Sequence, residues 1–176
     1  AAVAALDDHA PEGYEVGIEC THHGPTAVGA PSMFVELGSD EPQWDDQAGA
    51  EAVARAVLDL ADAPVDQGAG ATVDQGAAAT VNEADSNETA IAEHPRQLVG
   101  FGGGHYAPRF ERIVRETPWA VGHVGADWGL DAMGAPEQNR KIIDRAFSRS
   151  NTRYAVLEAD RPELAGVIED LGYRAV

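Results

Sequence analysis

Cysteine and long apolar runs are nearly absent from this sequence, and both absences narrow its interpretation. The single cysteine, Cys20, excludes an internal disulfide and a cysteine-rich zinc module. A chain without disulfides fits a reducing compartment, so we expect a cytoplasmic protein. No apolar run approaches the ~20 residues that a membrane-spanning helix requires. We therefore expect a soluble protein with no membrane partner.

The first residues lack two features that would mark a natural beginning. The stretch AAVAALDDHA contains neither an initiator Met nor the basic n-region of a secretory signal. Instead, AAVAALDD is typical of a helix that is already under way. We therefore expect the C-terminal portion of a longer protein. A length of 176 residues predicts one domain, spanning 1–176, with its own hydrophobic core.

Positive charge is scarce and unevenly distributed. The chain has 30 acidic residues against 12 basic ones, and Lys141 is its only lysine. This composition is typical of salt-loaded cytoplasm, where screening within about 3 Å at 1 M salt makes self-repulsion tolerable. An acidic protein from a low-salt organism is the alternative. Residues 1–95 contain one basic and 19 acidic residues, whereas residues 96–176 contain 11 of each. The overall balance argues against a nucleic-acid partner, but the second half can still present arginines to phosphate.

Hydrophobic periodicity predicts alternating strands and helices. Apolar alternation and apolar runs predict strands, and helical spacing with proline in the first turn predicts helices. The expected strands are 14–20, 32–38, 97–101, 119–126 and 153–159, and the expected helices are 44–63, 107–116, 135–150 and 161–173. This order predicts an α/β fold with a mainly parallel or mixed sheet flanked by helices. Ligands of such sheets bind at the carboxyl ends of the strands.

A short duplication interrupts this pattern. VDQGAGAT at 65–72 is followed directly by VDQGAAAT at 73–80. One duplication of eight residues is too short to form a solenoid, which needs at least three repeats. We predict a low-complexity, disordered surface insertion at about 64–92. A functional binding repeat is the alternative.

Histidines follow several of the predicted strands. His22 and His23 follow strand 14–20, His105 follows strand 97–101 across three glycines, and His123 lies within or just past strand 119–126. Successive side chains of a strand point to opposite faces, so His22 and His23 can share a site only if the strand has ended by Thr21. A turn could then aim both rings at one crevice.

The four histidines form a plausible zinc site, to which Glu19 or Glu36 could add a carboxylate. The alternative is that they are hydrogen-bonded packing residues, because the sequence contains no HExxH or CxxC spacing. Thr21 is a candidate hydroxyl nucleophile, although turn hydrogen bonds explain most such threonines. Cys20 alternates with Val16 and Ile18, which favours packing over reactivity.

The stretch GFGGGHY at 100–106 is typical of a phosphate- or oxyanion-binding loop. Its glycines let backbone N–H groups approach a ligand, and the next helix begins at about Ala107 with its positive end towards them. A tight turn is the alternative, because neither a P-loop nor a G-x-G-x-x-G motif is present. Arg109 could bind a phosphate or carboxylate, or form a surface salt bridge.

Four motifs together resemble one family. THHGPT, PSMFVELGS, GGGHYAPRF and VGHVGADWGL, in this order, are similar to the archaeal-type D-aminoacyl-tRNA deacylase, which plants share. The resemblance covers most of 14–62 and 96–172. The insertion at 64–92, Val124 and the ADWGL stretch depart from the family pattern. The family also normally begins with an N-terminal strand and helix that this chain lacks.

The resemblance implies a zinc-dependent esterase that cleaves D-aminoacyl-tRNA into free tRNA and D-amino acid, on a peptidyl-tRNA hydrolase- or phosphorylase-like α/β fold. Glu19 would be a general base or additional ligand, the Gly102, Gly103 and Gly104 amides would hold the oxyanion, and Arg109 would hold the 3′-terminal phosphate. The implied site residues also include Tyr106 as a substrate contact, Thr21 as a catalytic candidate, and His22, His23, His105 and His123 as zinc ligands or proton carriers. A monomer is expected.

Two other functions stay open from the sequence. One is a zinc hydrolase or phosphorylase-like enzyme that acts on a small metabolite and uses the glycine loop for phosphate. The other is a non-catalytic domain in which the histidines form a structural metal clasp. A closed site with four protein ligands would favour the clasp, because catalytic zinc keeps a position for water.

Overall fold

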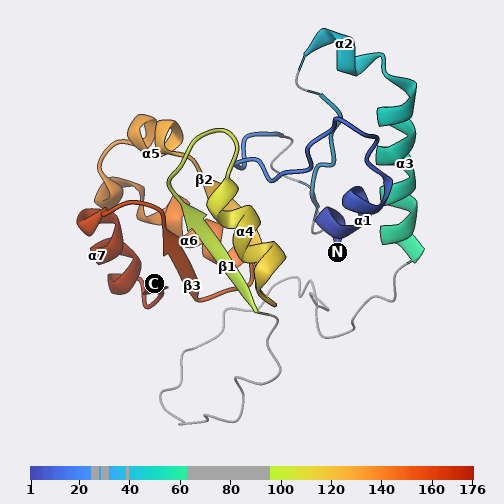
Figure 1. Cartoon of the computed structure of the whole chain (residues 1–176). Coiled ribbons are helices and arrows are strands. Elements are labelled where there is room, and N and C mark those ends of the chain that lie inside the picture. The colour runs from blue at the N-terminus through green and yellow to red at the C-terminus, as the bar shows by residue number, and fades with distance from the viewer. Residues whose placement is uncertain (25–27, 29–31, 39, 63–95) are drawn as a thin grey trace.

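Four parallel strands form the sheet in the C-terminal half of the chain. The computed structural model describes residues 1–24, 28, 32–38, 40–62 and 96–176. The strands lie in the spatial order β2-β1-β3-β4 and are β1 (Gln97–Phe101), β2 (Ala120–Gly125), β3 (Tyr154–Leu157) and β4 (Arg174–Ala175). Their pairings are all parallel, so the carboxyl ends share one edge of the sheet (Figure 1). The prediction of an α/β fold with a mainly parallel sheet is confirmed.

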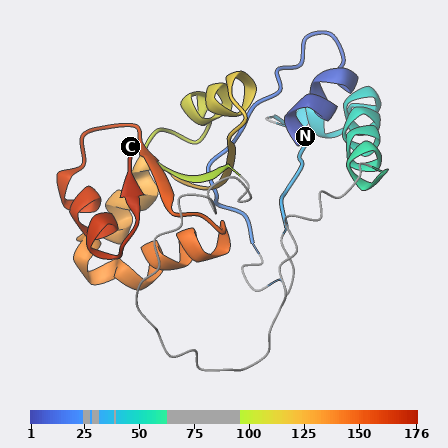
Figure 2. The same cartoon turned by 90° about the horizontal axis from the view of Figure 1, so that it is seen from below.

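Helices cover both faces of this sheet (Figures 1 and 2). One face is covered by α4 (Pro108–Glu116), and the other by α6 (Arg140–Arg149) and α7 (Pro162–Asp170). A short helix α5 (Asp127–Met133) and the 3-10 helix η3 (Pro136–Asn139) connect β2 to α6. Proline stands in the first turn of α4 and of α7, where the missing N–H costs nothing.

The central strand β1 is buried on both faces, which explains its continuous apolar run. Leu98 belongs to the cluster around Phe110 of α4, whereas Val99 belongs to the cluster around Phe147 of α6. Gly100 lets α4 approach closely, because a Cβ there would lie 2.6 Å from the Phe110 ring. The core therefore consists of two apolar layers, one on each side of the sheet.

The N-terminal half contains packed helices and extended segments. Helix α1 (Ala2–His9) packs against α3 (Gln47–Asp62), and the four-residue α2 (Glu41–Trp44) precedes α3. The hydroxyl of Tyr14 donates a 2.6 Å hydrogen bond to Asp46, which raises the pKa of Tyr14 and lowers that of Asp46. In this half, order rests on helix packing and side-chain hydrogen bonds rather than on a strand ladder.

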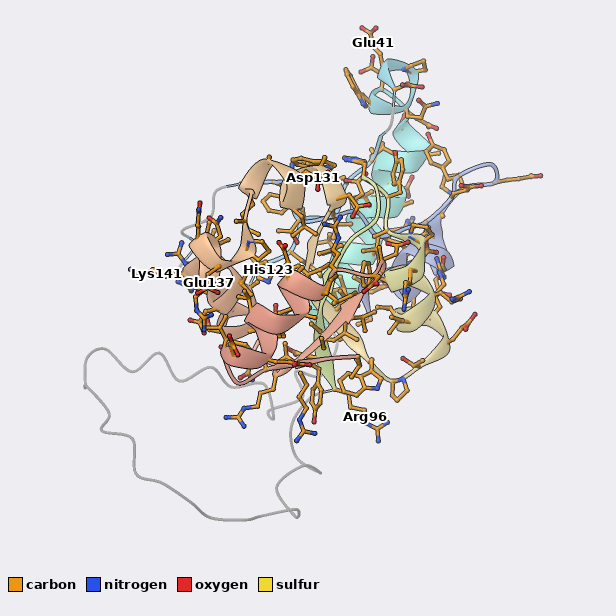
Figure 3. All side chains as sticks on the ribbon, turned by 90° about the vertical axis from the view of Figure 1, so that its left-hand side faces the viewer. Glu41, Arg96, His123, Asp131, Glu137 and Lys141 are labelled. Carbon is orange, nitrogen blue, oxygen red and sulfur yellow. The ribbon has the colours of Figure 1, made fainter. Side chains whose placement is uncertain are left out.

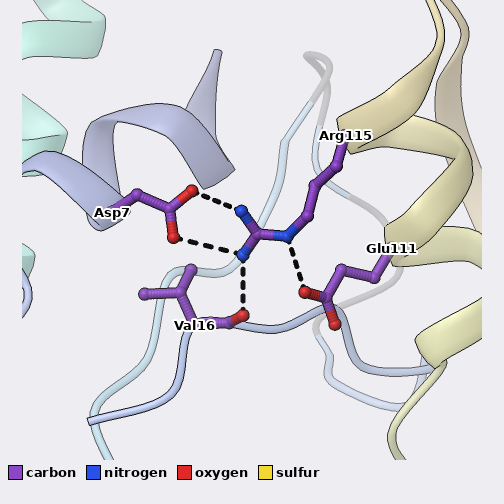
Figure 4. Close-up of polar contacts among 4 residues, drawn as sticks. All are labelled: Asp7, Val16, Glu111 and Arg115. Atoms are coloured by element: carbon purple, nitrogen blue, oxygen red, sulfur yellow. Dashed lines mark hydrogen bonds and ion pairs between the residues drawn. The ribbon is translucent and has the colours of Figure 1, made fainter.

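Arg115 of α4 ties the two halves together (Figure 4). Its guanidinium group binds both carboxylate oxygens of Asp7 in α1, donates to the carbonyl oxygen of Val16 at 2.9 Å, and donates to Glu111 at 2.6 Å. The hydrogen bonds to Asp7 and Glu111 raise the pKa of Arg115 further above its ordinary value. One side chain therefore fixes α1 and the segment after it against the α/β half.

Two predicted strands in the N-terminal half are wrong. Residues 14–20 alternate in burial as predicted, but they form no ladder with the sheet, and one bridge joins Glu19 to Tyr106. The buried side of the segment packs on the α4 layer while its backbone pairs with a loop. Residues 32–38 form no strand, and Met33 and Phe34 are exposed. Apolar residues there do not mark a strand covered on both faces.

The remaining predictions differ mainly at element boundaries. The helix expected at 44–63 divides into α2 and α3, because Asp46 caps α3 by accepting a 2.9 Å hydrogen bond from the N–H of Ala48. Helix α5 and strand β4 were not predicted, and the insertion predicted at 64–92 lies outside the described residues. No helix in the described ranges is long and apolar enough to cross a membrane.

Candidate functional site

The candidate site lies where the segment around Glu19 meets the loop after β1. The N–H of Cys20 donates to the carbonyl oxygen of His105, and the N–H of Ala107 donates to that of Ile18, each at 2.8 Å. Thr21 continues the contact, because its N–H donates to the carbonyl oxygen of Val124 in β2. These backbone bonds place His22, His23 and His105 together near the carboxyl ends of β1 and β2.

The adjacent histidines share one site because regular pairing stops at Thr21. The ring centroids of His22 and His23 lie 4.0 Å apart, and those of His22 and His105 lie 4.6 Å apart. Neither His22 nor His23 lies in a strand, so the two rings are not forced to opposite faces. The structure thus brings together three of the four histidines singled out from the sequence.

Two carboxylates border these rings. Glu19 lies between His105 and His22, with oxygen to Nε2 distances of 3.3 Å and 3.9 Å. Glu36 lies 2.7 Å from Nε2 of His23. The side chains of His23 and His105 are 40% and 48% exposed, whereas that of His22 is 21% exposed. The cluster is therefore open to solvent on one side.

Among the described residues, two groups of side chains could hold a metal ion. Their donor atoms lie within 4.8 Å of one another, and the groups are Glu19, His22 and His23, and Cys20, His22 and His105. The Nδ1 atom of His22 lies 2.8 Å from the carbonyl oxygen of Cys20. A carbonyl oxygen can only accept, so Nδ1 carries the proton and Nε2 keeps the lone pair that a metal requires.

Cys20 is the weaker ligand candidate. Its side chain is buried, and burial followed by the charge of Glu19 raises the pKa of the thiol. The thiolate is the form that binds metal, and this environment disfavours it. Nε2 of His22 also points towards Glu19 rather than towards the sulfur, which lies 3.8 Å from Nδ1. The geometry therefore favours the histidine and glutamate group.

His123 is not brought into this cluster. Its Nδ1 lies 2.7 Å from the Ser150 hydroxyl at the end of α6, and burial followed by the charge of Arg149 lowers its pKa. The next residue of β2, Val124, packs on the opposite face with Cys20. Alternation along β2 therefore turns His123 away from the other three histidines, and neither metal-binding group includes it.

The glycine loop carries backbone N–H groups next to His105. Gly102 and Gly103 have φ angles of +114° and +84°, which favour glycine. The N–H of Gly102 donates to Gly125 and is committed to the fold. The N–H groups of Gly103 and Gly104 donate to no group among the described residues. Two of the three amides predicted to hold an oxyanion are thus available.

The other predicted residues have identifiable contacts. Thr21 Oγ1 accepts a 3.0 Å hydrogen bond from the N–H of Val124, which fits the structural alternative to a nucleophile. Arg109 donates to the carbonyl oxygen of Glu158 at 3.2 Å and forms no salt bridge in the described part of the chain. The ring of Tyr106 packs edge-on against His105 at 5.1 Å.

Glu158 is a candidate that sequence reasoning missed. It follows β3 directly, and its Oε2 is buried without a hydrogen-bond partner among the described residues. A Cβ on Gly103 would collide with that oxygen, so the carboxylate lies against the glycine loop. A carboxylate at the carboxyl end of a predicted strand was the available signal. Buried, unpaired oxygens are costly, which makes Glu158 a candidate for binding a donor group of a ligand.

Comparisons with known proteins agree with one another. A family model described as D-aminoacyl-tRNA deacylase matches residues 1–176. A D-aminoacyl-tRNA deacylase of Halorubrum lacusprofundi is 59% identical over 174 residues, covering 99% of this chain and 33% of that protein. One of Haloarcula marismortui is 54% identical over 180 residues, covering 100% of this chain and 35% of that protein. The chain thus spans about a third of the length of these relatives.

A solved structure also has the same fold. The crystal structure of a conserved protein of unknown function superposes with a TM-score of 0.66 at 27% sequence identity. The superposition covers 99% of this chain and 53% of that protein. The fold of this chain is therefore similar to one found by experiment.

Proposed function

The chain belongs to the D-aminoacyl-tRNA deacylase family as a haloarchaeal-like member, and from this premise we propose that it hydrolyses the ester bond of D-aminoacyl-tRNA. The products would be free tRNA and a D-amino acid. The observation that carries the proposal is the meeting of His22, His23, His105 and Glu19 beside the amides of Gly103 and Gly104, which donate to no described residue. Ester hydrolysis requires an activated water and a donor set for the oxyanion, and both have candidates here.

Zinc is the proposed cofactor, and the residues fit it. Nε2 of His22, together with His23 and a Glu19 oxygen, offers the nitrogen and oxygen ligands that zinc takes in proteins, and the ring centroid of His105 lies 4.6 Å from that of His22. When bound, zinc lowers the pKa of a coordinated water to about 7, which supplies a nucleophile at neutral pH. The exposure of His23 and His105 leaves room for a substrate, which favours a catalytic site over a closed structural clasp.

Glu19 has two proposed roles that experiment can separate. As a ligand, it would complete the metal site with His22 and His23. As a general base, it would accept a proton from the attacking water and pass it towards His105, 3.3 Å away. Glu19→Gln removes the negative charge but retains an oxygen. Loss of activity with retained zinc would favour the base, whereas loss of both would favour the ligand.

The backbone and neighbouring side chains would position the substrate. The N–H groups of Gly103 and Gly104 would donate to the developing oxyanion, and Arg109 would pair with the 3′-terminal phosphate. Tyr106, exposed beside His105, would contact the terminal nucleotide. All these groups come from one chain, so we propose a monomer that acts in the cytoplasm, where aminoacyl-tRNA is used.

An open site favours tRNA over a small metabolite. A small-molecule site usually buries most of its ligand in a concave pocket, whereas His23 and His105 are each exposed by two fifths or more. A macromolecular substrate presents only its reactive end to such a surface. The small-metabolite hydrolase is therefore the weaker proposal.

The test combines zinc analysis with deacylation of matched D-Tyr-tRNA and L-Tyr-tRNA at multimolar KCl. We expect bound zinc, preferential release of D-tyrosine, and a loss of at least about 100-fold in His105→Ala with the fold intact by circular dichroism. His9→Ala is the matched control, because His9 pairs with Asp59 in the helical half. Undiminished turnover in His105→Ala would remove His105 from the site, and equal rates on both substrates would contradict the proposed function.

A further inference from the structure

Helix α6 carries a row of three cations outside the candidate site. Lys141, Arg145 and Arg149 are spaced four residues apart, so they lie along one face of the helix. All three are exposed, and Lys141 is the only lysine of the chain. None has a carboxylate oxygen within 4.0 Å among the described residues.

The carboxylates closest along α6 have other partners. Asp144 accepts a 2.6 Å hydrogen bond from the hydroxyl of Tyr173, and Glu137 pairs with Arg140 at 3.0 Å. Like charges four residues apart destabilise a helix, so the row is unfavourable for α6 alone. A chain with 30 acidic residues has ample means to neutralise three cations, yet no acidic residue of the described ranges forms an ion pair with any of them.

The row has a defined place relative to the sheet. The connection β2-α5-η3 leads into α6 from the carboxyl end of β2, and α6 returns to the amino end of β3. Its far end is fixed there, because Thr152 binds the carbonyl oxygen of Gln97 at the start of β1. Arg145 and Arg149 follow Lys141 at steps of about 6 Å along the helix, and α6 covers the face of the sheet opposite α4 and Cys20.

We propose that Lys141, Arg145 and Arg149 bind the sugar-phosphate backbone of the tRNA whose acceptor end occupies the histidine site. The inference rests on the proposed function and adds the surface that the nucleic acid would follow away from it. Evenly spaced cations without ion-pair partners in the described part of the chain match a chain of phosphates, which dominates the affinity of nucleic acids for proteins. At 1 M salt the Debye length is about 3 Å, so these cations would act by direct contact rather than by long-range steering.

The test compares two triple variants with the same change in charge. The row variant is Lys141→Gln, Arg145→Gln, Arg149→Gln, and the control is Arg96→Gln, Arg112→Gln, Arg174→Gln. The control arginines are equally exposed and equally without ion pairs among the described residues. Figure 3 shows Arg96 at one end of the molecule, well apart from Lys141.

The affinity for uncharged tRNA is measured by fluorescence anisotropy over a range of KCl in which circular dichroism shows all proteins folded. We expect the row variant to bind at least about tenfold more weakly, and its salt slope to fall by about 2.7, because each lost phosphate contact removes about 0.9. The affinity of the control variant for uncharged tRNA should change by less than about twofold. Equal losses in both variants, or an unchanged row variant, would overturn the inference.

This readout separates the inference from the proposed function, because uncharged tRNA requires no hydrolysis. A protein that binds tRNA through the row but releases no D-amino acid from D-Tyr-tRNA would contradict the proposed function alone. A protein that releases the D-amino acid while the row variant binds as tightly as the original would contradict the inference alone.

Discussion

The two halves of the chain reach order by different means. Residues 96–176 form a parallel sheet between two helical layers and carry equal numbers of acidic and basic residues, whereas residues 1–62 pack helices and extended segments under a large negative charge. We call residues 1–62 the acidic half and residues 96–176 the balanced half. His22, His23 and Glu19 come from the acidic half, and His105 and the glycine loop come from the balanced half. The candidate site is thus assembled where the halves meet, so its integrity depends on both.

The largest expected effect on folding comes from the glycine loop. A Cβ on Gly102 would lie 2.9 Å from the Cβ of Glu158, at a φ of +114° that other residues rarely adopt. We expect Gly102→Ala to lower the free energy of unfolding by about 3 kcal/mol, measured by urea denaturation. Gly129→Ala is the control, because nothing lies within 4 Å of its added Cβ in α5. Equal changes in the free energy of unfolding for Gly102→Ala and Gly129→Ala would show that the loop does not require glycine at position 102.

The balanced half was largely predictable from its sequence, and the reasons are local. A strand that is buried on both faces has consecutive apolar residues, such as Leu98 and Val99, and this run can be recognised in the sequence. Proline opens α4 and α7, and the three glycines after β1 indicate a close-packed loop. The short α5 was missed because seven residues provide little periodicity.

The acidic half was less predictable because residues 14–20 pair with a loop rather than joining the sheet ladder, and residues 32–38 form no strand. Alternation at Val16, Ile18 and Cys20 correctly indicated one buried side, but it carries no information about the backbone partner. The grouping of His22 and His23 was anticipated from the strand end. The orientation of His123 was not, because its face depends on the register of β2 against Val124.

Removing the Arg115 contacts that join the two halves should lower the free energy of unfolding by less than Gly102→Ala does. Arg115→Ala removes the contacts to Asp7, Glu111 and the Val16 carbonyl. We expect a loss of about 1 to 2 kcal/mol in unfolding free energy, because the side chain is one-third exposed and solvent screens its pairs.

Arg55→Ala serves as the control for that measurement. Among the described residues, Arg55 forms an ion pair with Glu51 of α3 alone, and its side chain is 60% exposed, so its removal should cost about 0.5 kcal/mol or less. A larger cost for Arg55 than for Arg115 would show that the halves are not joined through α4.

The smallest expected effect is a dependence of stability on pH. The pKa of His123 is lower in the folded protein than the ordinary 6.5, so the unfolded chain binds the proton more readily. The contribution of His123 is therefore complete above about pH 6.5 and is lost as the pH falls below that value. In urea denaturation at pH 7.5 and 5.5, His123→Gln should lose less stability between the two pH values than the original. An equal loss of stability in the variant and in the original protein would show that His123 does not contribute to the pH dependence.

The central claim is that histidines from both halves form one catalytic centre. It is tested most directly by a double-mutant cycle on the kcat/KM for deacylation of D-Tyr-tRNA, with His22→Ala, His105→Ala and the double variant. Residues that act as a unit are not additive, so the double variant should be about as slow as the slower single variant. Losses that multiply, or a single variant with full activity, would contradict a shared centre.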